Sequence, residues 1–244
     1  NMTGRHRMEE KERLEKLEGA EEHRATLEAA RKQAEEVYAR QAAGLTQARK
    51  AAAIALQQGM IKELKELGFA HGDFAVAFQP LAGISSQGAE RAEFLLSANA
   101  GEPLKPLEKV ASGGEMSRIM LAMKAMFAKG DAIETLIFDE IDTGISGRIA
   151  SVVGEKMVQI AHDHQVLCVT HLPQIAAMAD AHYLVEKHEI GGHARTSLRL
   201  LTMEERYQQV ASMMSGAGQS VTALEHAKEL IDGCITTKAH CKKG

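Results

Sequence analysis

The segment Leu136-Ile137-Phe138-Asp139-Glu140 is an apolar run that ends abruptly in two acidic residues. A short apolar run beside helical sequence is typical of a strand in a parallel sheet that is covered on both faces. Such sheets bind their ligands beyond the carboxyl ends of the strands, so both carboxylates should face a site. In phosphoryl transfer one acid there holds Mg²⁺ and its neighbour polarises the attacking water. We predict that Asp139 binds the metal and Glu140 the water; two solvated acids capping a strand are the alternative.

The next apolar run, Leu167-Cys168-Val169-Thr170, ends in a histidine, His171. A histidine beside a phosphate can donate a hydrogen bond to it, or titrate near neutral pH. We therefore expect His171 near the γ-phosphate of a nucleotide. The alternative is a histidine that is exposed or satisfied by its neighbours.

A serine and two glycines, in Ser112-Gly113-Gly114-Glu115, open the helical segment upstream of the acids. Serine can cap a helix, and glycines let backbone N–H groups approach a phosphate at the positive end of the helix dipole. The segment thus predicts a phosphate-binding helix start, with an ordinary flexible turn as the alternative. The order of the three segments along the chain favours the first interpretation.

Helices and strands are expected to alternate around these segments, which predicts an α/β fold with a mostly parallel sheet flanked by helices. We divide the chain into an arm at residues 1–58, a compact lobe at 59–235 and a flexible tail at 236–244. The expected strands are residues 74–78, 92–98, 135–138, 166–170, 182–187 and 196–201. The expected helices are residues 114–128, 146–162, a short one after Pro173, 203–214 and 220–231.

The arm is rich in Glu, Lys, Arg, Ala and Gln, and residues 8–58 contain no Pro, which favours one long solvated helix. About 50 helical residues span on the order of 75 Å, so the arm should project from the lobe. A single solvated helix or a disordered charged stretch is the alternative to pairing with a partner helix. A thin heptad seam falls on Leu17, Arg24, Arg31, Tyr38, Leu45 and Ala52, with Ala20, Leu27, Ala34, Gln41, Ala48 and Ala55.

Composition limits the remaining function classes. The formal net charge of −4 provides no overall basic field for nucleic acid or an acidic membrane. The three cysteines form no C-x-x-C pair, so neither a disulfide framework nor a zinc site is indicated. No apolar run approaches the roughly 18 residues of a membrane span. We expect a soluble protein of the reducing cytoplasm, without a membrane partner.

Together, the three segments resemble the signature motif, the Walker B strand and the switch histidine of ABC-type ATPases, in the same order. The residues after Glu140, Ile141-Asp142-Thr143-Gly144-Ile145-Ser146-Gly147, resemble the D-loop of the RecN family of bacterial, SMC-like DNA repair ATPases. The longer strings from Val110 to Ala122 and from Thr170 to Ala176 are also similar to that family.

The resemblance implies a specific architecture. In that family the two ends of one long chain, joined by an antiparallel coiled coil, form a single ATPase head, and this sequence matches the returning half. It contains no G-x-x-x-x-G-K-[ST], so the Walker A loop is expected on the N-terminal half. This half alone should then be inactive. Whether it is a natural truncation is left open.

The resemblance also implies roles for the site residues. Two heads would sandwich ATP and Mg²⁺, with Ser112, Gly113, Gly114 and Glu115 facing the nucleotide held by the other head. Asp139, Glu140 and His171 would serve the nucleotide on their own head, and Asp142 would couple the two sites. ATP binding would close the homodimer of heads, and hydrolysis would reopen it.

DNA repair and recombination, and a place near the bacterial nucleoid, are implied only by the resemblance. The sequence has 3 Tyr, 6 Phe and no Trp, too few aromatic side chains to suggest a base-stacking surface. DNA contacts would form on the assembled head dimer or on the arm. Two other functions stay open, the nucleotide-binding lobe of an ABC transporter and a non-catalytic structural coiled-coil module.

Overall fold

The computed structural model describes residues 2–109, 112–127, 133–190, 193–216 and 220–241. The chain divides into two compact units, which are described separately. Unit 1 consists of residues 1–54 and 77–93, and unit 2 of residues 55–76 and 94–244. The predicted string that begins at Val110 thus lies partly outside the described residues, as does the end of the predicted tail.

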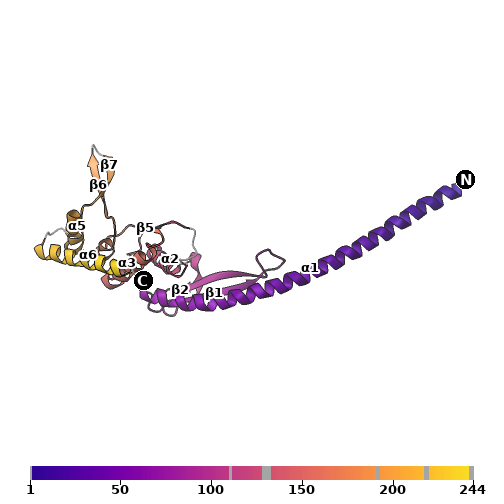
Figure 1. The fold of residues 1–244 in the computed structure, drawn as a ribbon, viewed down its shortest axis with the longest axis horizontal. Helices are drawn as coiled ribbons and strands as arrows, with labels where there is room; N and C mark the ends of the chain where they lie inside the picture. The colour runs from indigo at the N-terminus through magenta and orange to yellow at the C-terminus, as the bar shows by residue number, and fades with distance from the viewer. Residues whose placement is uncertain (1, 110–111, 128–132, 191–192, 217–219, 242–244) are drawn as a thin grey trace. The chain divides into compact units, whose positions relative to one another are not determined.

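A single helix, α1 (Met2–Glu66), forms the arm and continues into unit 2 (Figure 1). The side chains of residues 18–37 are all exposed, as expected for a solvated helix. The helix continues past residue 58, the predicted bound of the arm, and ends at Glu66, before Gly68 with φ 96°. Gly59 instead allows a close approach, because a Cβ atom there would lie 2.3 Å from the Met126 methyl carbon.

Within unit 1, α1 contacts the loop between β1 (Asp73–Pro80) and β2 (Glu90–Ser97). The Tyr38 hydroxyl donates to the Gly88 carbonyl at 3.1 Å, and Arg49 donates to the Gln87 carbonyl at 2.9 Å. Part of the predicted heptad seam therefore packs against the chain's own loop. Pairing of the more distal seam with a partner helix stays a prediction.

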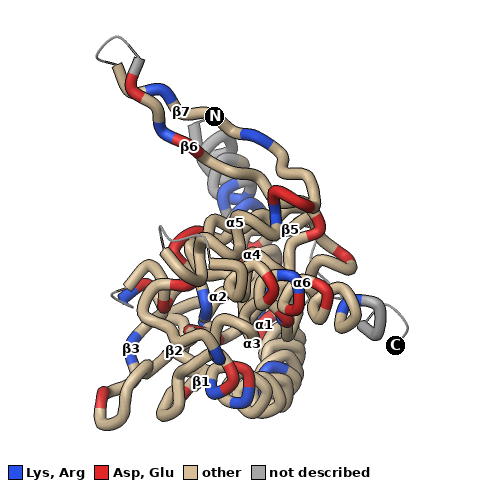
Figure 2. The backbone as a smooth tube through the Cα atoms, turned by 90° about the vertical axis from the view of Figure 1, so that its left-hand side faces the viewer, with Lys and Arg blue, Asp and Glu red and all other residues tan. Residues whose placement is uncertain are grey.

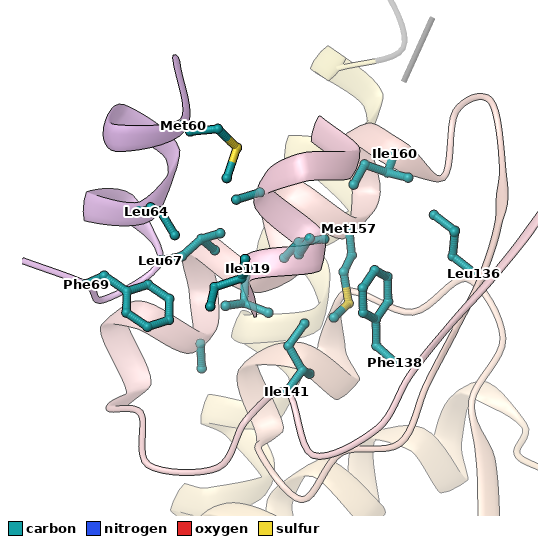
Figure 3. Packing of buried hydrophobic residues seen from close by; sticks show 14 of the residues in the cluster. Met60, Leu64, Leu67, Phe69, Ile119, Leu136, Phe138, Ile141, Met157 and Ile160 are labelled. Carbon is teal, nitrogen blue, oxygen red and sulfur yellow. The ribbon is translucent and has the colours of Figure 1, made fainter. Parts of the chain in front are cut away.

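The core of unit 2 joins the end of α1 to two later helices and a strand (Figure 3). These elements are α2 (Gly113–Phe127), β4 (Thr135–Phe138) and α3 (Gly147–Ile160). Their buried side chains form one cluster, so the end of α1 is part of the core of unit 2. Its members include Met60, Leu64, Leu67, Ile119, Leu136, Phe138, Ile141, Val153, Met157 and Ile160.

In the part of the chain that the structure describes, the strands form three small sheets. β3 (Lys105–Pro106) completes a sheet of order β1-β2-β3 and is followed by the short 3-10 helix η1 (Leu107–Lys109). β4 pairs in parallel with β5 (Gln165–Cys168), and the hairpin of β6 (Tyr183–Ile190) and β7 (His193–Leu200) is antiparallel.

Among the described residues, the β4–β5 sheet is covered on one face, whereas two covered faces were expected. Leu136 and Phe138 point into the core, whereas Ile137, Leu167 and Val169 are exposed. Alternate side chains of a strand point to opposite faces, so burying one set leaves the other set free.

The C-terminal region packs around a second cluster of buried residues that includes Ala177, Val210 and Ile231. It contains α4 (Pro173–Ala177), α5 (Met203–Ser215) and α6 (Val221–Cys241). A capping box of Thr202 and Glu205 starts α5. Helix α6 extends beyond its predicted end at Ile231 through most of the segment expected to be a flexible tail. Within the described ranges, none of the helices combines the length and apolar character of a membrane span.

Candidate functional site at the ends of two parallel strands

The parallel pairing of β4 and β5 brings the predicted site residues to one edge of a sheet. Phe138 lies opposite Cys168, and the Val169 N–H donates to the Phe138 carbonyl at 2.9 Å. The segments that leave the two strands, with Asp139 and Glu140 on one and His171 on the other, therefore start side by side. This is the placement that parallel topology predicts.

Asp139 and Glu140 are both exposed at this edge. Glu140 has φ 56°, the one non-glycine residue with positive φ in the part of the chain that the structure describes. That left-handed conformation is uncommon for a long side chain and costs on the order of 1 kcal/mol or more. Two hydrogen bonds stabilise the turn: the Glu140 N–H donates to Asp139 Oδ1 at 2.8 Å, and Ser117 Oγ donates to the Asp139 carbonyl at 2.8 Å.

The start of α2 lies against Glu140 of the same chain. The Ser112 side chain accepts from the Glu115 N–H at 3.4 Å, which caps the helix as predicted. A Cβ atom on Gly113 would lie within 2.4 Å of Glu140 Oε2, and one on Gly114 within 2.7 Å of the Glu140 carbonyl oxygen. Gly114 thus requires glycine, because a Cβ atom there would meet backbone, whereas a Cβ atom at Gly113 would have to displace the end of the Glu140 side chain. The sequence indicated neither contact.

Asp142 and His171 are in contact through a buried carboxylate. Asp142 is 4% exposed, and its Oδ2 accepts from the His171 N–H at 2.8 Å and from the Thr170 hydroxyl. The same oxygen lies 3.0 Å from His171 Nδ1, while the histidine side chain is 71% exposed. All these contacts lie within one chain, whereas the expected role of Asp142 was to couple two heads.

Arg118 is a site residue that the sequence reasoning missed. It is buried, and its guanidinium donates to the carbonyls of Ile141 at 3.2 Å and Thr143 at 2.9 Å. It also lies over the Phe69 ring, 5.2 Å from the centroid. Burial lowers the pKa of Arg118, and the charge of Glu115 opposes that shift. The sequence signal that could have revealed this residue is an arginine among the apolar residues of α2.

Cys168, at the end of β5, is not a nucleophile candidate. Burial raises the pKa of its thiol to about 12, and the charges of Asp142 and Asp139 add to the shift. The reactive form of cysteine is the thiolate, which such a pKa disfavours at neutral pH.

Magnesium is compatible with Asp139. No group of three or more His, Cys, Asp or Glu side chains is placed to hold a metal among the described residues. A Mg²⁺ ion usually takes only one or two carboxylates, with phosphate oxygens and water completing its octahedron. The exposed carboxylate of Asp139 at a strand end fits that requirement.

Known proteins resemble this chain over most of its length, although no family model matches it. The DNA repair protein RecN of Halalkalibacterium halodurans is 43% identical over 205 residues, covering 82% of this chain and 36% of the relative. RecN of Bacillus subtilis is 37% identical over 235 residues, covering 90% and 41%. RecN of Mycobacterium leprae is 34% identical over 251 residues, covering 95% and 42%. The Smc head domain with an extended coiled coil from Pyrococcus furiosus has a TM-score of 0.45 and 19% identity, covering 68% of this chain and 39% of that one.

The fold is an α/β lobe preceded by a long helix. By its sequence, the chain belongs to the RecN family and corresponds to the C-terminal part of such a protein. It spans only 36–42% of the length of the three relatives named above.

Proposed function

We propose that this chain is the half of a DNA repair and recombination ATPase that supplies the residues for ATP hydrolysis. The observation that carries the proposal is the convergence of three segments at one sheet edge. Gly113 lies against Glu140, Ser117 binds the Asp139 carbonyl, and Asp142 binds His171. An acid pair, a histidine and a helix N-terminus are the groups that phosphoryl transfer uses for charge stabilisation and positioning.

In this mechanism each residue has one task. Asp139 would hold Mg²⁺, which when bound to ATP neutralises phosphate charge. Glu140 would orient and polarise the attacking water, and His171 would contact the γ-phosphate. The helix start from Ser112 to Glu115 would present its positive dipole end to the nucleotide of a second head. Hydrolysis would thereby be coupled to opening of a head homodimer.

The proposed partner is the N-terminal half of the same protein, which would carry the Walker A loop. Two exposed apolar surfaces of unit 2 support the proposal of such a partner. Ile137, Leu167 and Val169 leave one face of the β4–β5 sheet apolar and uncovered. The β6–β7 hairpin exposes Tyr183 opposite Leu200 and Val185 opposite Leu198, and an isolated hairpin is marginally stable in water.

The length of the relatives supports the same partner, because more than half of each relative lies outside the matched part. Within the chain we propose the functional division made from the sequence, an arm at residues 1–58 and a head lobe at 59–235. This half alone should not hydrolyse ATP.

DNA binding is proposed for the intact protein. Lys and Arg are interspersed with Asp and Glu along the backbone (Figure 2), and the totals are 29 basic and 33 acidic residues. Contacts with DNA would therefore form on the head dimer or the paired arm. Binding of DNA by the full-length protein should weaken as salt rises, because phosphate contacts release counterions. Salt-independent binding would count against this part of the proposal.

The test is steady-state ATP hydrolysis by this chain alone and after mixing with the N-terminal half. We expect activity only in the mixture, and loss of that activity with Glu140→Gln. Activity of the chain alone would reveal another nucleotide site and overturn the split head. Full activity of the Glu140→Gln mixture would favour the non-catalytic coiled-coil module, and co-fractionation of the native protein with membranes would favour the transporter lobe.

A further inference from the structure

Asp142 is a buried carboxylate directly beneath an exposed histidine. It is 4% exposed, and its Oδ2 atom is shared by the His171 N–H at 2.8 Å, the Thr170 hydroxyl and His171 Nδ1 at 3.0 Å. Burying a carboxylate is unfavourable unless donors surround it. Here the donors come from the segment that carries His171, so the carboxylate and the histidine are held as one assembly.

The segment around Asp142 is itself fixed to α2. Arg118 donates to the carbonyl of Ile141, the residue before Asp142, and to that of Thr143, the residue after it. The Thr170 hydroxyl, which donates to Asp142, also accepts from the Leu172 N–H at 3.0 Å. The backbone on both sides of the carboxylate and the backbone that carries the histidine are therefore both restrained.

This geometry decides which nitrogen of the ring is available. The Nδ1 atom lies 3.0 Å from a buried carboxylate oxygen, at ion-pair distance. A negative charge at that distance favours a proton on Nδ1 and leaves Nε2 as the nitrogen that can meet a nucleotide or water. A neutral ring then accepts at Nε2, and a charged ring donates there with Asp142 as its counter-ion.

We infer that Asp142 is a positioning residue for His171, which keeps Nδ1 protonated and aims Nε2 at the reacting nucleotide. The inference rests on the proposed function, because it gives His171 a task in hydrolysis. It differs from contact with a second head, since Asp142 acts here through a residue of its own chain. Asp142 itself touches no substrate in this role.

The experiment is a double-mutant cycle in the full-length protein, with Asp142→Asn, His171→Gln and the double variant. An amide has the shape of the carboxylate but can turn its N–H₂ toward Nδ1, which selects the opposite tautomer. We expect Asp142→Asn to lower kcat on the order of 10- to 100-fold, with KM for ATP nearly unchanged. In the His171→Gln background it should cause no further loss. The matched control is Asp163→Asn, which alters an exposed carboxylate 2.9 Å from His162 Nδ1 and should leave kcat unchanged.

Equal losses from Asp142→Asn with and without His171 would overturn the inference while leaving the proposed function intact. Absence of hydrolysis by the wild-type protein, or full activity of both Glu140→Gln and His171→Gln, would instead overturn the proposed function. The ¹⁵N chemical shifts of the His171 ring, assigned by their loss in His171→Gln, test the geometry without activity. A proton on Nδ1 is expected, and a wild-type ring protonated only on Nε2 would overturn the inference.

Discussion

At the scale of single residues, Glu140 combines an unfavourable backbone with the task proposed for it. Its φ of 56° suits glycine, which has no Cβ atom to clash in the left-handed region. We predict that Glu140→Gly is more stable than Glu140→Ala by about 1 kcal/mol. Neither variant should hydrolyse ATP when combined with the N-terminal half. Chemical denaturation of the two variants of this chain measures the difference, and equal stabilities would show that the conformation is unstrained.

Gly113 is a second residue at which a substitution would act through Glu140. A methyl group there would lie within 2.4 Å of Glu140 Oε2, so Gly113→Ala must displace that carboxylate. We predict a loss of hydrolysis of at least about tenfold in the intact protein, since small misplacements of catalytic groups are costly. The matched control is Gly19→Ala, where nothing lies within 4 Å and a helix interior gains stability of up to about 1 kcal/mol. Unchanged turnover in Gly113→Ala would contradict the observed contact.

At the scale of elements, one lysine of α3 binds two glutamates near the end of α1. Lys156 on α3 places its Nζ atom 2.6 Å from both Glu63 and Glu66 near the end of α1, and its side chain is 9% exposed. Lys156→Met would leave two carboxylates without their cation. We predict a loss of about 2–4 kcal/mol in the free energy of unfolding. Arg24→Met is the control, since its pair with Glu28 is exposed and contributes less than about 1 kcal/mol.

The same cluster predicts a pH dependence of stability. A hydrogen bond from Lys156 lowers the pKa of Glu66 below 4.5 in the folded chain. The corresponding stabilisation is present above that unfolded-state value and is lost as the pH falls through the folded-state pKa. Burial opposes the charge of Lys156, but hydrogen bonds to Glu63 and Glu66 outweigh it and raise its pKa above 10.5, so its contribution is lost at alkaline pH. Thermal midpoints of Lys156→Met should therefore fall less than those of wild type on acidification from pH 6 to pH 3.5.

Elements with a strong local pattern could be predicted from the sequence, and contacts between distant residues could not. β4 lies at the predicted residues, and α2 and α3 end within two residues of their predicted bounds. The arm was predicted at residues 1–58, whereas α1 continues to Glu66. The close approach of Met126 to Gly59 is a contact between distant residues, which local composition does not reveal. At the site, parallel topology placed Glu140 and His171 at one edge. The hydrogen bonds that Arg118 donates and Asp142 accepts bridge more than 20 residues of sequence and leave no local pattern.

At the scale of the whole molecule, the uncovered face of the β4–β5 sheet should be where the two halves associate. Ile137 is 71% exposed on that face. We predict that Ile137→Asp weakens binding of this chain to the N-terminal half at least about tenfold, because the charge would be buried without a partner. The folded chain alone should keep its stability. Ile84→Asp is the matched control, since Ile84 is 70% exposed on the β1–β2 loop. Equal affinities of the two variants in a titration would show that the interface lies elsewhere.

The uncovered sheet also bears on the direction of synthesis. A ribosome releases the N-terminal part of a RecN-type protein first, so the proposed cover is already synthesised when the exposed residues Ile137, Leu167 and Val169 emerge. In a permuted gene that encodes this half first, the apolar face and the open strand edges would stay exposed to solvent until the other half is synthesised. That exposure would favour aggregation. The earlier half would thus act as an internal chaperone for the later one.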